Sequence, residues 1–315
     1  MAVSTIDPNG LNVGQFGNRN LIINGSFRVS QRGDYTSAST MTHNVYMLDR
    51  WRNSVGVAST IQDLGGYVEI KATAASGAST ARINQRFEDL YLLEGQTVTV
   101  SCEMKSNSTN GRLMMHNGSW VSTDATHSGS GQWESLSFTV TMPDSLTVTS
   151  VHVGIDGNVS ADVPIAVGDY VQIKNVQLEV GDTATPFEHP RSYGDELARC
   201  QRYYRRIGNT GDASTYQMLF SGFLGTANRV YGSLMLSPSM RTQPTMGTTG
   251  TATHYAIMNL NQSTACSVVP AMDGQSSEQT IFLFVDTGTS LTAGGGVEIR
   301  GNNNVTAHIA FDAEL

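Results

Sequence analysis

The sequence contains very little lysine and little charge of either sign. Its 315 residues include three lysines, Lys71, Lys105 and Lys174, and charged residues make up 15% of the chain. Disordered chains combine low hydrophobicity with high charge density, and helical bundles are rich in Ala, Glu, Lys and Leu, so both classes are disfavoured. The net charge of -8 also argues against nucleic acid as a partner, because phosphate binding requires cations.

Long hydrophobic runs and a cysteine pattern are missing as well. No apolar run approaches the ~20 residues that cross a bilayer, and the amino-terminal segment lacks the basic and apolar regions of a secretory signal. We therefore expect no membrane insertion and synthesis in a cytoplasm. Cys102, Cys200 and Cys266 are too far apart for a disulfide framework or a zinc site, which predicts three reduced, mostly buried thiols.

Small polar residues are abundant instead, and they accompany a strand pattern. Serine and threonine make up about a fifth of the chain. In residues 96–106 the apolar side chains alternate with Thr, Ser and Glu, which is the period of a strand with one buried face. The same alternation recurs at 67–73, 133–142, 148–156 and 169–181. Short strands separated by Gly, Asn, Asp and Ser turns predict an antiparallel jelly-roll β-sandwich.

Three details refine this prediction. Residues 20–33 have the pattern of a strand, an Asn24-Gly25 turn and a second extended run. Trp51 is interpreted as a core aromatic residue at a strand end. The last strand changes parity between Ile173 and Val176, which predicts a β-bulge near Lys174 and Asn175. All of these positions are read directly from the sequence.

One convincing helix is predicted over residues 192–207. Ser192 and Asp195 can form a capping box at its start. Leu197, Cys200 and Tyr204 form a single stripe at helical spacing. This stripe would pack either on the sandwich or against its copies around a three-fold axis.

Residues 208–315 return to short strands joined by very polar linkers. The predicted organisation therefore has four parts, which are an amino-terminal arm at 1–19, a jelly-roll sandwich at 20–190, a linking helix at 191–207 and a carboxy-terminal β domain at 208–315. Long polar loops are common on surfaces that contact variable ligands.

Several segments together resemble a module of bacteriophage tail fibre and related virion fibre proteins. The segments are NLIINGSFRVSQRG at 20–33, YMLDRW at 46–51 and IKNVQLEVGDTATPFEHPRSYGDELARCQRYYRR at 173–206. SPSMRTQPTM at 237–246 and HIAFDAEL at 308–315 are similar to fibre carboxy-terminal elements. In that module a carbohydrate-binding-like jelly roll precedes a short helix and a β tip.

The resemblance implies a non-enzymatic, homotrimeric virion component whose distal β domain binds a host glycan or another receptor. The arm would attach to other phage tail or capsid proteins through its spaced apolar residues Ile6, Leu11, Val13 and Phe16. A structural virion component without receptor binding, such as a capsid-decorating fibre, a baseplate protein or a tail-hub protein, is the alternative. A polysaccharide depolymerase is the third hypothesis.

Candidate ligand-binding residues are aromatic and amide side chains near turns, because sugar sites combine aromatic faces with a few polar groups. In the sandwich these are Trp120, Trp133, Asn117 and Asp124, although both tryptophans could simply cover the sandwich core. In the carboxy-terminal domain Tyr255 and the loops 245–253 and 286–304 could form a receptor surface. Solvated loops or contacts between subunits remain the alternative for that region.

Cofactor and catalytic sites are weakly indicated. Related sandwiches hold a structural calcium between the first and last strands, for which Asn24 and Glu179 are the candidates. Lys174 and Asn175 stand where an acidic residue is expected, which puts that site in doubt. No other cofactor is expected. The sequence has no spaced carboxylate pair, parallel β-helix repeat or hydrolase motif that would predict an enzyme.

Overall fold

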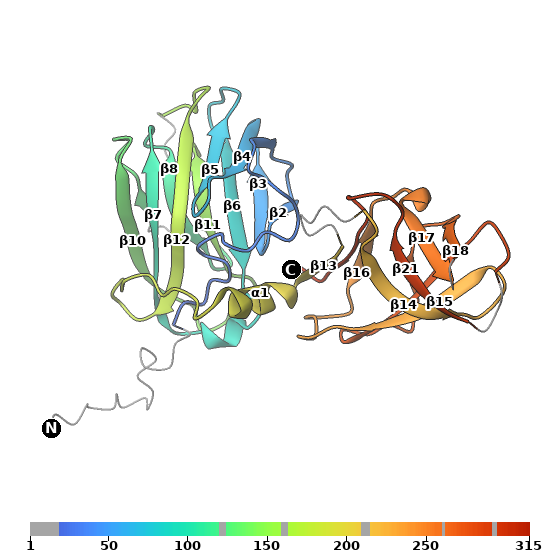
Figure 1. Ribbon diagram of the computed structural model, residues 1–315. Coiled ribbons are helices and arrows are strands. Elements are labelled where there is room, and N and C mark those ends of the chain that lie inside the picture. Colours follow the sequence, from blue (N-terminus) through green and yellow to red (C-terminus); the bar gives the residue numbers. More distant parts are fainter. Residues whose placement is uncertain (1–18, 120–123, 159–162, 209–214, 260–261, 292–294) are drawn as a thin grey trace. The chain divides into compact units, whose positions relative to one another are not determined.

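The computed structural model describes residues 19–119, 124–158, 163–208, 215–259, 262–291 and 295–315 (Figure 1). Two compact units divide the chain, the first reaching Glu196 and including Leu315, the second running from Leu197 to Glu314. Antiparallel strands build both units. The expected fold class, mainly β with one short α-helix and a second β domain, is confirmed.

The first unit is a sandwich of two six-stranded sheets. Sheet I has the order β1 (Ser39–Thr40), β4 (Ser59–Asp63), β5 (Val68–Ala72), β12 (Tyr170–Val180), β7 (Thr97–Ser106) and β10 (Trp133–Thr141). Sheet II has the order β2 (Tyr46–Leu48), β3 (Trp51–Val55), β6 (Thr80–Arg86), β11 (Ser150–Asp156), β8 (Gly111–His116) and β9 (Ala125–Thr126). A 3-10 turn, η2, spans Leu90–Leu92. From β3 onward the chain repeatedly switches between the sheets, as in a jelly roll.

Alternating side chains fill the space between the two sheets. In β7 the residues Val98, Val100 and Met104 are fully buried, and the intervening side chains point outward. Neighbouring β12 shifts register between Lys174 and Gln177, with Asn175 at a φ of 54°. The predicted β-bulge is confirmed, and it keeps apolar residues inside on both sides of the shift.

The amino-terminal segment departs from the predicted hairpin. Asn24 has a φ of 59°, so the turn at Asn24-Gly25 forms, but no strand is assigned over the described residues 19–38. The segment instead lies beside β12, where the Leu21 amide donates to the Leu178 carbonyl at 2.9 Å. The prediction is wrong because side-chain hydrogen bonds replace the ladder that a hairpin would have formed. Trp51 is confirmed as a core residue with no exposed surface.

The helix is shorter than predicted. Helix α1 covers Tyr193–Gln201, and residues 204–207 form strand β13 (Tyr204–Ile207). Ser192 caps the helix, since its Oγ accepts the Asp195 amide at 3.1 Å, which is one of the two bonds of the predicted capping box. Tyr204 is therefore not on the helix, and Cys200 and Tyr204 are 0% and 9% exposed within one chain. The stripe of Leu197, Cys200 and Tyr204 proposed for the trimer is therefore not available as a whole, because Cys200 and Tyr204 are already buried within one chain.

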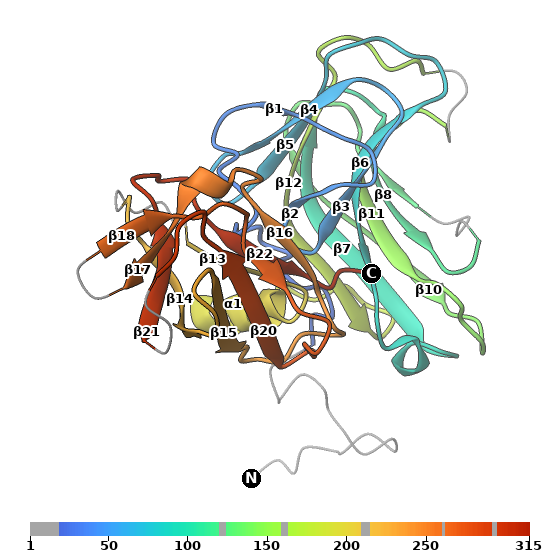
Figure 2. The same cartoon turned by 90° about the vertical axis from the view of Figure 1, so that its right-hand side faces the viewer.

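The second unit contains a three-stranded sheet and a seven-stranded sheet around its own core. Sheet III has the order β13, β22 (Ile309–Asp312) and β16 (Thr245–Thr248). Sheet IV has the order β18 (Gln262–Ala265), β17 (Tyr255–Asn259), β21 (Gly296–Gly301), β14 (Met218–Leu224), β15 (Arg229–Met235), β20 (Thr280–Asp286) and β19 (Ala271–Met272). Figure 2 shows strands of this unit, among them β17, β21, β14 and β15, and a 3-10 turn, η3 (Ala252–His254), precedes β17.

The three cysteines are free and buried, as predicted. Burial raises the pKa of Cys266 to about 12, so its thiol stays protonated and unreactive at neutral pH. Among the described residues, no helix has both the length and the apolar character needed to cross a membrane.

Candidate functional site

Sheet I presents a partly exposed tryptophan on its outer side. Trp133 begins β10 and lies opposite Lys105 of β7. Leu136 and Phe138 of the same strand point into the core, so the opposite parity places Trp133 on the outer side. The residue is 37% exposed, and its indole therefore offers aromatic surface to solvent.

Neighbouring side chains hold this indole in place. The Tyr67 ring meets it edge to face, with centroids 5.6 Å apart, and the Lys174 ammonium lies 4.4 Å from its centroid. The Lys174 Nζ atom is 3.0 Å from a Glu103 oxygen, and Asn175 Nδ2 donates to the other Glu103 oxygen at 2.6 Å. We call Trp133, Tyr67, Lys174, Glu103 and Asn175 the Trp133 platform.

The platform keeps a charged hydrogen-bond acceptor beside an aromatic surface. Burial alone would raise the pKa of Glu103, but the hydrogen bonds from Asn175 and Lys174 and the charge of Lys174 lower it below its ordinary value. Glu103 is therefore ionised at neutral pH. An aromatic face with adjacent carboxylate, amide and ammonium groups can stack on a sugar ring and bind its hydroxyls.

A cavity of about 400 Å³ adjoins the platform. Asn175 belongs to both, and Gly66, at the cavity wall, precedes Tyr67 in the chain. The cavity is lined by Ser26, Phe27, Arg28, Asp63, Gly65, Gly66, Asn175 and His189. Its lining is mostly polar, and its volume is within the range of small-ligand sites.

The structure separates the sandwich residues that the sequence had grouped. Trp120 lies outside the described residues. The Asp124 carboxylate pairs with Arg112 Nη1 of β8 at 2.6 Å, in sheet II, whereas Trp133 belongs to sheet I. Asn117 is half-buried in the turn after β8, where its amide donates to the Ser119 carbonyl. Trp133 therefore does not share one site with Asp124, because the turn between β9 and β10 changes sheets.

A second aromatic surface lies on the outer side of sheet IV. The strand register places Phe223, Tyr231 and Phe284 in one row across β14, β15 and β20. Tyr231 stacks on Phe282, with centroids 5.8 Å apart and planes at 14°. Phe223 is 53% exposed. We call these four rings the aromatic row.

A polar cavity of about 480 Å³ borders the aromatic row at Tyr231. Arg229 spans its wall and donates from Nε and Nη2 to the two Asp286 oxygens, at 2.6 and 2.7 Å. This two-point pairing lowers the pKa of Asp286, chiefly through the hydrogen bond from Arg229. The lining consists of Thr226, Asn228, Arg229, Tyr231, Ser267, Asp286 and Thr287.

The predicted receptor residue of this domain is corrected. Tyr255 has no exposed surface, and its hydroxyl donates to the His308 carbonyl at 2.7 Å while accepting the Thr249 amide. Tyr255 is therefore a core residue that cannot touch a ligand at the surface. Residues 245–253, which were expected to form a loop, belong largely to β16 and η3. The second expected loop, 286–304, contains β21 and includes residues that the structure does not describe.

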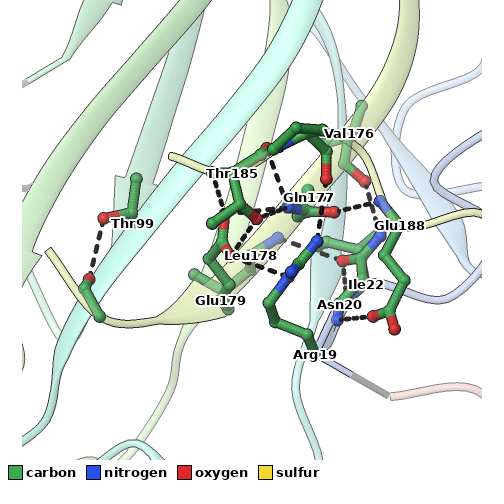
Figure 3. Close-up of polar contacts among 12 residues, drawn as sticks. Arg19, Asn20, Ile22, Thr99, Val176, Gln177, Leu178, Glu179, Thr185 and Glu188 are labelled. Carbon is green, nitrogen blue, oxygen red and sulfur yellow. Dashed lines mark hydrogen bonds and ion pairs between the residues drawn. The ribbon is translucent and has the colours of Figure 1, made fainter. Parts of the chain in front are cut away.

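The calcium candidate Glu179 is fully engaged by protein groups (Figure 3). One carboxylate oxygen accepts from Gln177 Nε2 and from the Thr185 amide, each at 2.9 Å. The other accepts the Thr185 hydroxyl at 2.7 Å and lies 3.1 Å from Arg19 Nε. These four contacts use the lone-pair directions that a cation would need.

Asn24, the second calcium candidate, is also engaged. Its Nδ2 donates to the Val29 and Asp49 carbonyls, and its Oδ1 accepts the Val29 amide. Asn24 and Glu179 are thus both bonded to protein groups, and the calcium site stays a prediction from the sequence. Within the described ranges, no group of three or more His, Cys, Asp or Glu side chains could hold a metal ion.

Sequence reasoning missed most of the platform and the whole aromatic row. Tyr67 and Lys174 lie on strands far from Trp133 in the chain, so no local pattern indicates that they meet. A usable signal exists for Phe282 and Phe284, because β20 is apolar at nearly every position rather than alternating. Such a strand must place apolar residues on both sides of its sheet.

Comparisons with known proteins return structural resemblance only; no family model and no curated protein matches the sequence. A TmCBM61 module in complex with β-1,4-galactotriose shares 14% identity over 52% of this chain and 99% of that chain, with a TM-score of 0.32. The enzymatically active domain of tailspike protein 4 from bacteriophage CBA120 shares 12% identity over 52% and 22%, at 0.31. The tandem CBM22 module of Paenibacillus barcinonensis Xyn10C shares 8% identity over 90% and 98%, at 0.29. At TM-scores below 0.5, none of these resemblances indicates what this chain binds.

Proposed function

We propose that this chain is a fibre protein of a bacteriophage virion, on the tail or another appendage, and that it binds glycan on the host surface without catalysis. The sequence segments at 20–33, 46–51 and 173–206 support the virion role through their resemblance to fibre proteins. The observation that carries glycan binding is the Trp133 platform beside its cavity, where an exposed indole adjoins fixed polar groups.

The proposed mechanism is reversible, multivalent attachment by a homotrimer. A single shallow site that stacks one sugar ring binds weakly, and three sites on one particle bind together through their high effective concentration. The amino-terminal arm would join the chain to other phage tail or capsid proteins. Its candidate residues Ile6, Leu11, Val13 and Phe16 lie outside the described part of the chain.

The carboxy-terminal domain is proposed as the distal recognition surface of the fibre. Its support is the aromatic row, together with the polar cavity that begins at Tyr231. Exposed aromatic side chains beside hydroxyl and amide groups suit a saccharide as well as a protein receptor. The domain is thus a second place, besides the Trp133 platform, at which a host surface could be bound.

A binding role rather than hydrolysis is supported by the carboxyl groups. A glycosidase general acid needs a raised pKa so that it carries a proton near neutral pH. Downward shifts in pKa are found for the carboxyl groups of Asp34, Glu103, Glu134 and Asp286. Hydrogen bonds from Ser128 and Ser130, for example, lower the pKa of Glu134 to about 2.

The experiment compares Trp133→Ala with Tyr91→Ala in the full-length chain. Removing the indole should weaken binding to a neutral oligosaccharide at least tenfold, because a central aromatic contact is worth roughly 1.5–3 kcal/mol. Tyr91 is the matched control, since it is 70% exposed in η2. Isothermal titration against a panel of neutral oligosaccharides provides the measurement, and equal affinities for both variants would overturn the assignment.

A third variant separates the two domains. Phe223→Ala removes an exposed ring from the aromatic row. Loss of binding in this variant, with Trp133→Ala unaffected, would assign glycan recognition to the carboxy-terminal domain. Absence of binding by the unmodified chain to any glycan would favour the structural virion component, and release of reducing sugar would favour the depolymerase.

A further inference from the structure

The outer side of sheet II concentrates positive charge in a chain that is acidic overall. Arg52 of β3, Arg82 and Arg86 of β6, and Arg112 of β8 all lie on this side, because the alternate residues of β6, β8 and β11 fill the core. The sequence has 16 arginines, so a quarter of them lie on one side of one sheet. We call this set, with His116 and His152, the basic face.

The strand register shows how closely these side chains are grouped. Arg86, Ser150 and His116 form one row across β6, β11 and β8. Arg52, Asn84, His152 and Met114 form the next row, and Ser54, Arg82, Gly154 and Arg112 form a third. Strands lie about 4.8 Å apart and alternate residues about 7 Å apart, so the six basic side chains originate from an area of roughly 14 by 14 Å.

Two of the arginines are fixed and two are unpaired. Arg82 pairs with Asp156, and Arg112 pairs with Asp124. Their side chains are 11% and 7% exposed, so they are held flat against the sheet. Arg52 and Arg86 are partly exposed, and in the described part of the chain their side chains have no hydrogen-bond or ion-pair partner. After pairing, the face therefore retains an excess of two positive charges.

Gly154 contributes to the shape of the face. It lies between Arg82 and Arg112 in the register, and a Cβ added to it would come within 2.5 Å of the Arg82 Cα atom. Its φ of 148° is also one that side chains rarely adopt. The missing side chain at Gly154 therefore lets β11 approach the β6 backbone closely between the two arginines.

Two histidines lie among these arginines. Burial lowers the pKa of His116, and the charges of Arg82 and Arg86 lower it further. Burial lowers the pKa of His152 more strongly, with added effects of Arg82, His116 and Arg86. Both imidazoles are thus kept neutral by surroundings that favour negative charge nearby.

We propose that the basic face binds an acidic polysaccharide through its carboxylate or phosphate groups. Guanidinium groups match the geometry of both anions, and Arg52 and Arg86 are the two that are free to make such bonds. Ser54 is partly exposed beside Arg82 in the register and can bond to a sugar hydroxyl. The choice of a polysaccharide rests on the proposed function, whereas the anion site rests on the charges alone.

Binding at this face should depend on pH. An anion placed beside His116 and His152 favours their charged forms and raises their pKa, so binding takes up protons and strengthens as pH falls. The charged groups that face them are Arg52 of β3, Arg82 and Arg86 of β6, Arg112 of β8, Asp156 of β11 and Asp124 before β9. Uronic acid carboxylates stay ionised above about pH 5, so the trend reflects the protein.

The test uses the full-length chain and three probes, hexagalacturonate, neutral galactohexaose and inorganic phosphate. The variant Arg52→Gln/Arg86→Gln removes the two unpaired charges and should weaken hexagalacturonate binding at least tenfold. The control Lys71→Gln/Arg300→Gln removes the same charge elsewhere and should change it less than twofold. In the unmodified chain, affinity should rise several-fold from pH 7.5 to pH 5.5, while thermal unfolding checks that both variants fold.

The outcomes separate this proposal from the proposed function. Loss of galactohexaose binding in Trp133→Ala tests the platform and leaves the basic face unaffected. Equal loss of hexagalacturonate binding in both charge variants would overturn the basic face as the site. Full competition by millimolar inorganic phosphate, or tighter binding of a single-stranded oligonucleotide of equal charge, would overturn the polysaccharide as its ligand.

Discussion

At the residue scale, the most constrained side chain is the buried carboxylate of Glu179. It is 1% exposed and accepts hydrogen bonds from Gln177 and Thr185 while lying beside Arg19. The surrounding bonds join β12 to the amino-terminal segment, since Asn20 Oδ1 accepts both the Ile22 and Leu178 amides. This network holds the start of the sandwich against its last strand (Figure 3).

Glu179→Gln should therefore destabilise the sandwich by about 2–4 kcal/mol, because the new amide group turns a donor toward existing donors in a buried site. Glu69→Gln is the control, since Glu69 is partly exposed and accepts one bond, from Gln172 at 2.8 Å. Its expected effect is below about 1 kcal/mol. Urea unfolding at pH 7 measures both, and equal stabilities of the two variants would contradict the structural role of Glu179.

Single residues also show which positions can be predicted from the sequence and which cannot. Trp51 and the three cysteines are buried as expected, because apolar character alone decides their position. Tyr255 is predicted at the surface but is buried. Its hydroxyl bonds to Thr249 and to His308, and neither partner is indicated by a local sequence pattern. The Trp133 platform joins β5, β7, β10 and β12, and such cross-strand neighbours cannot be inferred from local spacing.

At the element scale, alternation predicted the long strands well. The expected strands at 96–106 and 169–181 correspond to β7 and β12, and the parity change near Asn175 correctly indicated a bulge. The predicted helix extended too far, because residues 204–207 pair with β22 about a hundred positions later. A helical stripe is weak evidence when a distant strand offers a full ladder of hydrogen bonds.

The cap of α1 gives a prediction at this scale. Ser192→Ala removes the acceptor for the Asp195 amide and should cost the first turn about 1 kcal/mol. That energy corresponds to roughly fivefold faster hydrogen exchange at amides 194–197. Ser137→Ala, at an exposed position of β10, is the control and should leave those amides unchanged. Equal exchange rates of amides 194–197 in both variants would show that the Ser192 cap does not stabilise the first turn of α1.

At the scale of the whole molecule, the two units have separate cores and offer different surfaces. The sandwich carries the Trp133 platform on sheet I and the basic face on sheet II, and the second unit carries the aromatic row. The chain has few lysines and a net charge of -8, and a quarter of its arginines lie on the outer side of sheet II. The sequence predicted the two β domains, whereas the distribution of charge over the sheets required the strand register.

The proposed homotrimer predicts the mass of the particle in solution. Light scattering on the full-length chain should give about three times the chain mass of 33.8 kDa. The stripe of Leu197, Cys200 and Tyr204 is not its interface, so Leu197→Ser should leave the mass unchanged. A stable particle with the mass of one chain would exclude the homotrimer.

Binding of a sugar ring at Trp133 can be seen in a crystal structure of the complex. The chain would be crystallised with the neutral oligosaccharide that binds most tightly in titration. We expect a sugar ring stacked on the Trp133 indole, with its hydroxyls bonded to Glu103 or Asn175. A sugar bound elsewhere, with the Trp133 platform unoccupied, would contradict the claim.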